Sequence, residues 1–231
     1  MERILSNYCK QILNLHSAKL SEEYYYNSLP LCIIDAVFSI GIRYSTTKQA
    51  VINFCNSQEI VRLRKHGSSY PVESKQLSIR EFLDLYKIYN IEEMANSIYQ
   101  NRCRTSARNG ILKSEAVLKF AEVLYQHQIN YFQDLSYFIG NLELENSIKR
   151  IPGQKSGIST NYFYMLAGDE NYIKTDRMII RFIELCIKKK VNYHEANQLI
   201  KNAYQILKKD FPLLTLRELD HQIWKYQKNI V

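Results

Sequence analysis

Apolar residues recur along most of the chain at the 3.6-residue spacing of an α-helix, and no segment shows the strict apolar–polar alternation of a strand. Three stripes with i, i+3, i+4, i+7 spacing are clear: 117–125, 179–187 and 196–207. Capping-box pairs, Ser78 with Glu81 and Thr215 with Glu218, predict helix starts. Only 7 glycines and 4 prolines interrupt the 231 residues. The pattern predicts an all-α protein.

The clearest break in this pattern is the stretch Ile-Pro-Gly-Gln-Lys-Ser-Gly-Ile-Ser-Thr, residues 151–160. Pro152 and Gly153 end one predicted helix, and Gly157, Ser159 and Thr160 open the next. Glycines permit positive φ at such a turn. The first amides of the second helix have no internal partner, so they can hold a phosphate oxygen and fix register on DNA without reading its sequence. An ordinary helix–helix turn explains the same residues, and the pattern alone leaves both interpretations open.

Asp176 stands directly before the stripe at 179–187. Aspartate is a favoured helix N-cap, worth about 1 kcal/mol, so this carboxylate needs no catalytic role to explain it. A functional role is a second interpretation, because a hairpin, a short helix and a loop at Gly168 precede Asp176 in that order.

Composition narrows the class of protein. Hydrophobic residues make up 46% and charged residues 23%, which is typical of a folded chain. The apolar run at 29–42 is interrupted by Asp35 and is too short to span a bilayer. No secretory signal is evident, so we expect a cytoplasmic protein, nucleoid-associated if its source is bacterial, with no membrane partner. A net charge of +8 favours a polyanion as partner.

The five cysteines form no Cys-x-x-Cys pair and no close cluster. Structural metal sites and Fe–S clusters usually show short ligand spacings. We therefore expect no metal, no disulfide and no cofactor.

The order Ile-Pro-Gly, then Ser/Thr, then Asp176 before an arginine-bearing helix resembles the helix-hairpin-helix Gly/Pro-Asp superfamily of DNA glycosylases, endonuclease III among them. Residues 104–124 resemble the family's helix before the hairpin, and residues 29–55 its first core helix and the DNA-facing loop. The resemblance implies two helical lobes with a DNA cleft between them. Residues 30–168 would form the barrel lobe with the hairpin. Residues 1–29 plus 169–231 would form the lobe with Asp176.

The hairpin also departs from the family pattern. Gln154, Lys155 and Ser156 separate its two glycines, where the family has one residue. Members that also cut the strand carry a lysine just after the second glycine, whereas Ile158, Ser159 and Thr160 stand here. The Fe–S cysteines of some members are missing as well. The resemblance thus implies a monofunctional glycosylase, with a lyase alternative left open through Lys155.

In this family the aspartate stabilises positive charge on the sugar and directs water to it, which the resemblance assigns to Asp176. The residues it assigns to DNA binding are Pro152, Gly153, Gln154, Lys155, Gly157, Ser159, Arg177 and Arg181. Those it assigns to the base pocket or to a wedge are Asp35, Ser39, Ile42, Arg43, Tyr44 and Trp224. Structural roles fit several of these residues equally well: core packing for Tyr44 and Trp224, a buried hydrogen-bonded group for Asp35, and a solvated surface residue for Arg181.

The resemblance therefore implies a monomeric enzyme that flips a damaged or modified base out of double-stranded DNA and hydrolyses its N-glycosidic bond. Divergence from the repair members leaves room for a bulky base, such as the glucosylated cytosines of phage DNA, and hence for antiviral defence beside DNA repair. One alternative is a non-catalytic helix-hairpin-helix protein that only binds DNA. A second alternative is an unrelated helical interaction protein.

Overall fold

The computed structural model describes residues 1–230, and within them every extended element is a helix, with only isolated bridges between single residues. The prediction of an all-α fold is confirmed. The chain divides into two compact units. Unit 2 is Glu22–Gly168, and unit 1 joins Met1–Ser21 to the chain from Asp169 onward.

Residues 22–29 lie in unit 2, whereas the resemblance places them in the lobe with Asp176. Backbone bonds tie them there, because Asn27 N donates to Arg62 O at 3.0 Å and Arg64 N donates to Tyr25 O at 2.8 Å. The side chain of Asn27 also donates to Lys75 O at 2.7 Å. No hydrophobic stripe marks these contacts, so the pattern of apolar residues could not indicate them.

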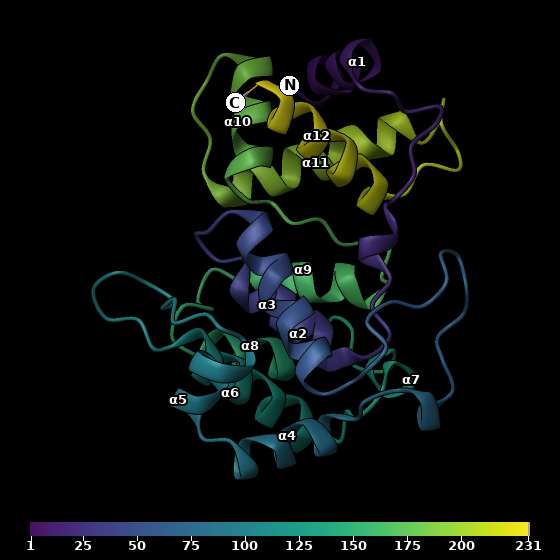
Figure 1. The fold of residues 1–231 in the computed structure, drawn as a ribbon. Helices are drawn as coiled ribbons and strands as arrows, with labels where there is room; N and C mark the ends of the chain where they lie inside the picture. The colour runs from purple at the N-terminus through teal and green to yellow at the C-terminus, as the bar shows by residue number, and fades with distance from the viewer. Residues whose placement is uncertain (231) are drawn as a thin grey trace. The chain divides into compact units, whose positions relative to one another are not determined.

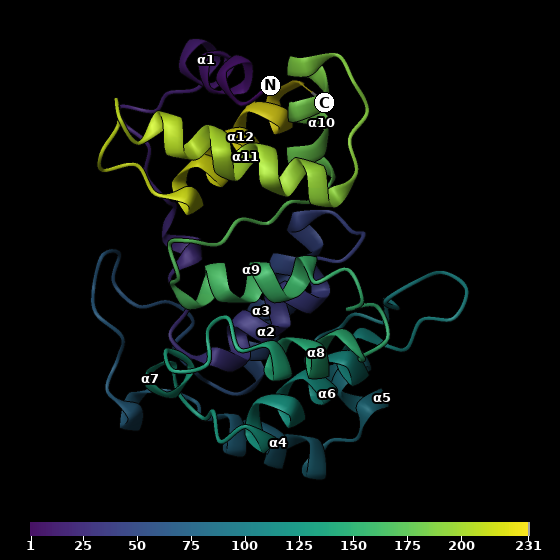
Figure 2. The ribbon, with the colours of Figure 1, turned by 180° about the vertical axis from the view of Figure 1, so that it is seen from behind.

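Unit 2 is built around α2 (Leu29–Phe38), in which every residue is buried. Apart from Asp35, the helix is apolar on all sides, which is the pattern of a central helix rather than a surface one. Helices α3, α6 and α9 pack against it (Figures 1 and 2). The helices of this unit after α2 are α3 (Tyr44–Ser57), α4 (Ile79–Ile88), α5 (Ile91–Glu93), α6 (Lys113–Gln126), α7 (Phe132–Leu135), α8 (Leu142–Lys149) and α9 (Ile158–Ala167). A π-helical turn, Met94–Ile98, follows α5.

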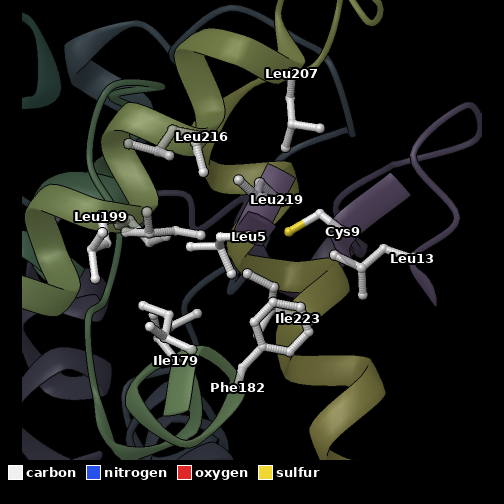
Figure 3. Packing of buried hydrophobic residues seen from close by; sticks show 14 of the residues in the cluster. Leu5, Cys9, Leu13, Ile179, Phe182, Leu199, Leu207, Leu216, Leu219 and Ile223 are labelled. Carbon is white, nitrogen blue, oxygen red and sulfur yellow. The ribbon is translucent and has the colours of Figure 1, made fainter. Parts of the chain in front are cut away.

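Unit 1 consists of α1 (Glu2–Ile12), α10 (Arg177–Ile187), α11 (Tyr193–Leu207) and α12 (Leu216–Ile230). Its core draws on all four helices: Leu5 and Cys9 of α1 meet Phe182 of α10 and residues of α11 and α12 (Figure 3). Each fully buried aliphatic or aromatic side chain contributes about 1.5–3 kcal/mol to folding. The first and last segments of the chain therefore hold each other in place.

Both predicted capping boxes are confirmed. Glu81 N donates to Ser78 Oγ at 3.1 Å, and Ser78 N donates to Glu81 Oε2 at 2.8 Å. Thr215 and Glu218 exchange the same pair of bonds at 2.9 and 3.2 Å. The stripe at 117–125 is correct except at its end, where Tyr125 is 43% exposed. Tyr125 lies at the edge of the stripe in the last turn of α6, whereas Leu124 in the same turn is fully buried.

No helix among residues 1–230 combines the length and apolar character needed to cross a bilayer.

Candidate functional site

The predicted helix-hairpin-helix is present as α8, a tight turn and α9. Gly157 N donates to Gln154 O at 3.0 Å, and Gln154 N donates to Ile151 O at 2.9 Å, so two successive turns close the hairpin. Gly153 has φ +90° and Gly157, the N-cap of α9, has φ +73°. An L side chain is strained in this left-handed region, which explains a glycine at both positions.

Two hairpin residues that the resemblance assigns to DNA binding turn their side chains inward, so that role could involve only their main chain. Gln154 is fully buried, and Ser159 is 3% exposed. The Ser159 hydroxyl donates to Gln154 Oε1 inside the turn. The longer turn between the two glycines brings Gln154 back over the first turn of α9, so its amide fills the hairpin. Because Gln154 N already donates to Ile151 O, the main-chain amide of Ser159 is the one of the two that remains suited to an outside ligand.

The outer side of the hairpin is formed by Pro152, Gly153, Lys155 and Ser156, which are all exposed. The amides of the first turn of α9 have no partner within the helix, because the first intrahelical bond there runs from Asn161 N to Gly157 O at 3.0 Å. The hairpin thus offers main-chain donors beside one exposed lysine, which suits an anionic oxygen.

A second segment packs directly on this turn. A methyl group placed on Gly153 would lie only 2.5 Å from Cβ of Thr105. Thr105 begins a loop that is closed by Thr105 N donating to Ile111 O at 2.9 Å. Residues 101–112 and 147–160 contain no Asp or Glu and together carry these basic side chains: Arg102, Arg104, Arg108, Lys149, Arg150 and Lys155. Two of these side chains are paired with acids, Arg102 with Glu92 at 2.6 Å and Lys149 with Glu145 at 3.4 Å. The local excess of positive charge in the hairpin and this loop therefore comes from Arg104, Arg108, Arg150 and Lys155.

The turn between α2 and α3 carries four of the residues assigned to a pocket or wedge. Ser39 caps α2, Gly41 has φ +68°, and Ile42 and Arg43 lead into α3, which begins at Tyr44. Gly41 and Arg43 are exposed, and Ser39 and Ile42 are half-buried.

This turn is fixed from the core side by a residue that no motif of the sequence marks. Lys113, fully buried at the start of α6, donates from Nζ to Phe38 O at 2.8 Å and to Ile40 O at 2.6 Å. A cation at the C-terminal end of α2 also complements that helix dipole. The only sequence signal was a lysine next to an apolar stripe, which is more often a surface residue.

Asp35 is the buried, hydrogen-bonded group of the two alternatives considered. It is fully buried, and its Oδ2 accepts from the hydroxyls of Tyr26 at 2.8 Å and Tyr162 at 3.4 Å. Tyr44 donates its hydroxyl to Glu23 Oε2 at 2.9 Å. Burial, and then the charge of Asp35, raise the pKa of Tyr44 well above its usual range, so this phenol keeps its proton.

Asp176 lies in unit 1 and is the N-cap of α10, as predicted. Its Oδ1 accepts from Met178 N at 2.8 Å, while its Oδ2 lies 4.0 Å from Lys174 Nζ. The side chain is 27% exposed. One carboxylate oxygen therefore serves the helix, and the other lies beside a cation and remains partly accessible.

The remaining assigned residues of unit 1 lie on α10 and α12. Arg177 and Arg181 are exposed one helical turn apart on α10. Trp224 of α12 is half-buried, with its ring stacked on His221 at 5.9 Å and Lys228 Nζ 5.0 Å from its centre. The structure thus groups the assigned residues into a hairpin and a turn in unit 2, and an aspartate with two arginines in unit 1.

Comparison with known proteins adds a family and a fold. The model of a domain of unknown function, DUF8548, matches residues 3–228. The chain belongs to the DUF8548 family. No curated protein sequence matches this DUF8548 chain. A solved structure described as MBOgg1 in complex with a low-affinity DNA ligand is similar, with a TM-score of 0.57 and 14% sequence identity.

The similarity covers 87% of the DUF8548 chain and 60% of MBOgg1. The DUF8548 chain thus spans less than two thirds of that protein. At this level of identity the likeness shows a shared helical fold.

Proposed function

We propose that this DUF8548 protein is a DNA glycosylase that extrudes a damaged or modified base from double-stranded DNA and hydrolyses its N-glycosidic bond. The observation that carries the proposal is the geometry of Asp176. Only one of its two carboxylate oxygens is bonded to the helix that it caps, and the residue follows a helix-hairpin-helix in the chain. A fold shared with a protein solved on DNA supports the same conclusion.

The chemistry assigned to Asp176 follows from its two oxygens. Breaking the bond between C1′ and the base nitrogen leaves positive charge on the sugar, which a fixed carboxylate stabilises. Water then adds its hydroxyl to C1′, and its proton leaves through a carboxylate oxygen acting as general base. Because Oδ1 is bonded to Met178 N, Oδ2 is the oxygen suited to this role.

The hairpin would bind a phosphate through the first amides of α9, with Lys155 adding a charge-assisted contact. Arg177 and Arg181 would add phosphate contacts from unit 1. The turn that Lys113 fixes would supply the wedge or pocket residues Ile42 and Arg43. We assign no pocket role to the side chain of Asp35 and no DNA contact to the side chains of Gln154 and Ser159, because all three are buried.

A monofunctional reaction fits the hairpin best. The first turn of α9 contains no lysine, and Lys155 lies on the exposed side of the turn. Borohydride reduction during the reaction would trap a covalent protein–DNA adduct if a lysine formed a Schiff base. We expect no adduct with the wild type, and an adduct that Lys155→Ala abolishes would establish the lyase alternative instead.

The proposal covers two kinds of substrate and two biological roles. Repair of damaged bases and defence against phage DNA with hypermodified cytosines both remain within the proposal. A panel of duplexes distinguishes them, provided that it includes glucosylated hydroxymethylcytosine DNA beside uracil, oxidised and alkylated bases. Release of only the small lesions would exclude the bulky-base version.

The decisive experiment compares base release by the wild type, Asp176→Asn and Asp169→Asn. Asparagine caps helices about as well as aspartate, so Asp176→Asn should keep its stability while losing at least about 100-fold in release rate. Asp169, in the same unit, accepts a local bond from Asn171 N, so its variant should release base at the wild-type rate. DNA affinity, measured by fluorescence anisotropy, should be unchanged in both variants.

One observation favours a non-catalytic DNA-binding protein, namely that Asp176 does form a regular N-cap. That alternative predicts firm DNA binding with no release from any duplex and no effect of Asp176→Asn. An unrelated interaction protein would show neither release nor firm binding.

A further inference from the structure

The segment that leads into α10 is held from two other helices of unit 1. Lys174 N donates to Asp220 Oδ1 of α12 at 3.2 Å, and Thr175 Oγ1 donates to Asn197 Oδ1 of α11 at 3.0 Å. Thr175 is fully buried. Asp176 N in turn donates to Lys174 O at 2.6 Å. The position of Asp176 therefore depends on side chains that are far away in the sequence.

Lys174 links the two carboxyl groups directly. Its amide bonds to Asp220, its carbonyl accepts from the amide of Asp176, and its ammonium lies 4.0 Å from Asp176 Oδ2. A shift of Asp220 would therefore be passed through one residue to the carboxylate proposed to be catalytic.

Asp220 differs sharply from Asp176 in its surroundings. It is 5% exposed, whereas the Asp176 side chain is 27% exposed. Burial, and then the negative charge of Asp176, raise the pKa of Asp220 well above its usual range, against a smaller lowering by Lys174. Arg217 and His221 are buried neighbours on α12 itself, and Asn197 of α11 carries no charge.

We propose that Asp220 is a positioning residue for Asp176: from α12 its carboxyl group anchors the main chain of Lys174, and Lys174 in turn holds the main chain at Asp176. Burial favours the protonated form of Asp220, and in that form Asp220 still accepts the bond from Lys174 N without adding a negative charge beside Asp176. The inference rests on the proposed glycosylase function and adds a residue that no motif marks.

The test uses Asp220→Asn and Asp220→Ala, with Asp210→Asn, an exposed aspartate of the same unit, as the control. The amide carbonyl of Asp220→Asn still accepts from Lys174 N, so single-turnover release at pH 7 should stay within about twofold of wild type. Asp220→Ala removes the acceptor and should slow release by roughly ten- to 100-fold with DNA affinity unchanged, because displaced catalytic groups lose rate rather than binding.

The pH profile separates positioning from a purely structural role. In the wild type, raising the pH ionises Asp220 beside Asp176, and release should fall on the alkaline side. Asp220→Asn cannot ionise, so this fall should be absent, whereas Asp210→Asn should keep it.

Thermal melting gives a readout that needs no activity. An aspartate whose pKa is raised by folding stabilises most below its unfolded pKa of about 3.9 and loses that contribution as pH rises toward the folded value. The melting temperature of Asp220→Asn should therefore rise relative to wild type as the pH increases above about 4. A constant difference would overturn the proposal.

Three further outcomes would overturn the positioning role of Asp220. Equal release rates for Asp220→Ala and Asp220→Asn would overturn the positioning role while leaving the glycosylase proposal intact. If Asp220→Ala does not fold, an alkaline fall retained in Asp220→Asn overturns the role instead. Absence of release by the wild type on every duplex would overturn the proposed function and this inference together.

Discussion

At the scale of single residues, the hairpin is packed from inside by the buried Gln154 and from outside by Thr105 against Gly153. Asp176 was predictable as an N-cap because capping depends on a local pattern, and the structure confirms it. The inward position of Gln154 was not predictable, because spacing along the chain does not determine which way a side chain points in a turn. The bond from Lys174 N to Asp220 was not predictable either, because the two residues are 46 positions apart in the sequence.

Gly153 and Gly41 provide a matched pair for testing the hairpin. Both have positive φ, but a methyl group on Gly41 meets nothing within 4 Å, whereas on Gly153 it lies 2.5 Å from Thr105 Cβ. Alanine at Gly41 should cost only the backbone penalty, about 1–2 kcal/mol of unfolding free energy. Alanine at Gly153 should cost a further 1–3 kcal/mol or so from overpacking. Urea denaturation measures both, and equal losses would show that Thr105 does not constrain the hairpin.

At the scale of helices, existence and type were predictable, because long 3.6-residue stripes and capping boxes are local signals. The contacts between helices were not. Lys113 follows a loop and precedes an apolar stripe, so nothing local indicates that its ammonium reaches the end of α2. Burial of a charged group becomes evident only once α2 and α6 are packed together.

Lys113→Met should test how the turn after α2 is held. Methionine fills similar space but leaves the carbonyls of Phe38 and Ile40 without this donor. The loss should be on the order of 1–3 kcal/mol in unfolding free energy. Lys119→Met on the same helix breaks only a half-exposed pair with Glu115, so it should change stability by less than about 0.5 kcal/mol. Chemical denaturation with similar losses for both variants would contradict the anchoring role.

At the scale of the whole molecule, composition indicated a folded helical chain with a net charge of +8, and the resemblance pointed to a fold that the comparison with MBOgg1 supports at 14% identity. Assignment of residues 22–29 to unit 2 depended on long-range backbone bonds and lay beyond what the sequence could indicate.

The charge distribution predicts how DNA binding responds to salt. If the hairpin and its neighbouring loop bind phosphates, Lys155→Ala and Arg108→Ala should each reduce the slope of log affinity against log salt by about 1. Lys87→Ala, which removes an exposed charge paired with Asp84 on α4, should leave the slope unchanged. Anisotropy titrations between about 50 and 200 mM salt measure it, and equal slopes for all three variants would place the DNA contact elsewhere.

The way unit 1 is assembled from both ends of the sequence has a consequence for synthesis. Leu5 and Cys9 of α1 are translated before unit 2, yet they are covered by residues of α10, α11 and α12, which are translated after it. Unit 2 is one continuous stretch and can fold while the ribosome is still working. While unit 2 is being synthesised, α1 therefore carries an uncovered apolar face. A chain released early, before Tyr193–Leu207, would lack the helix on which α1 chiefly packs and would expose that face to chaperones and proteases although its hairpin is complete.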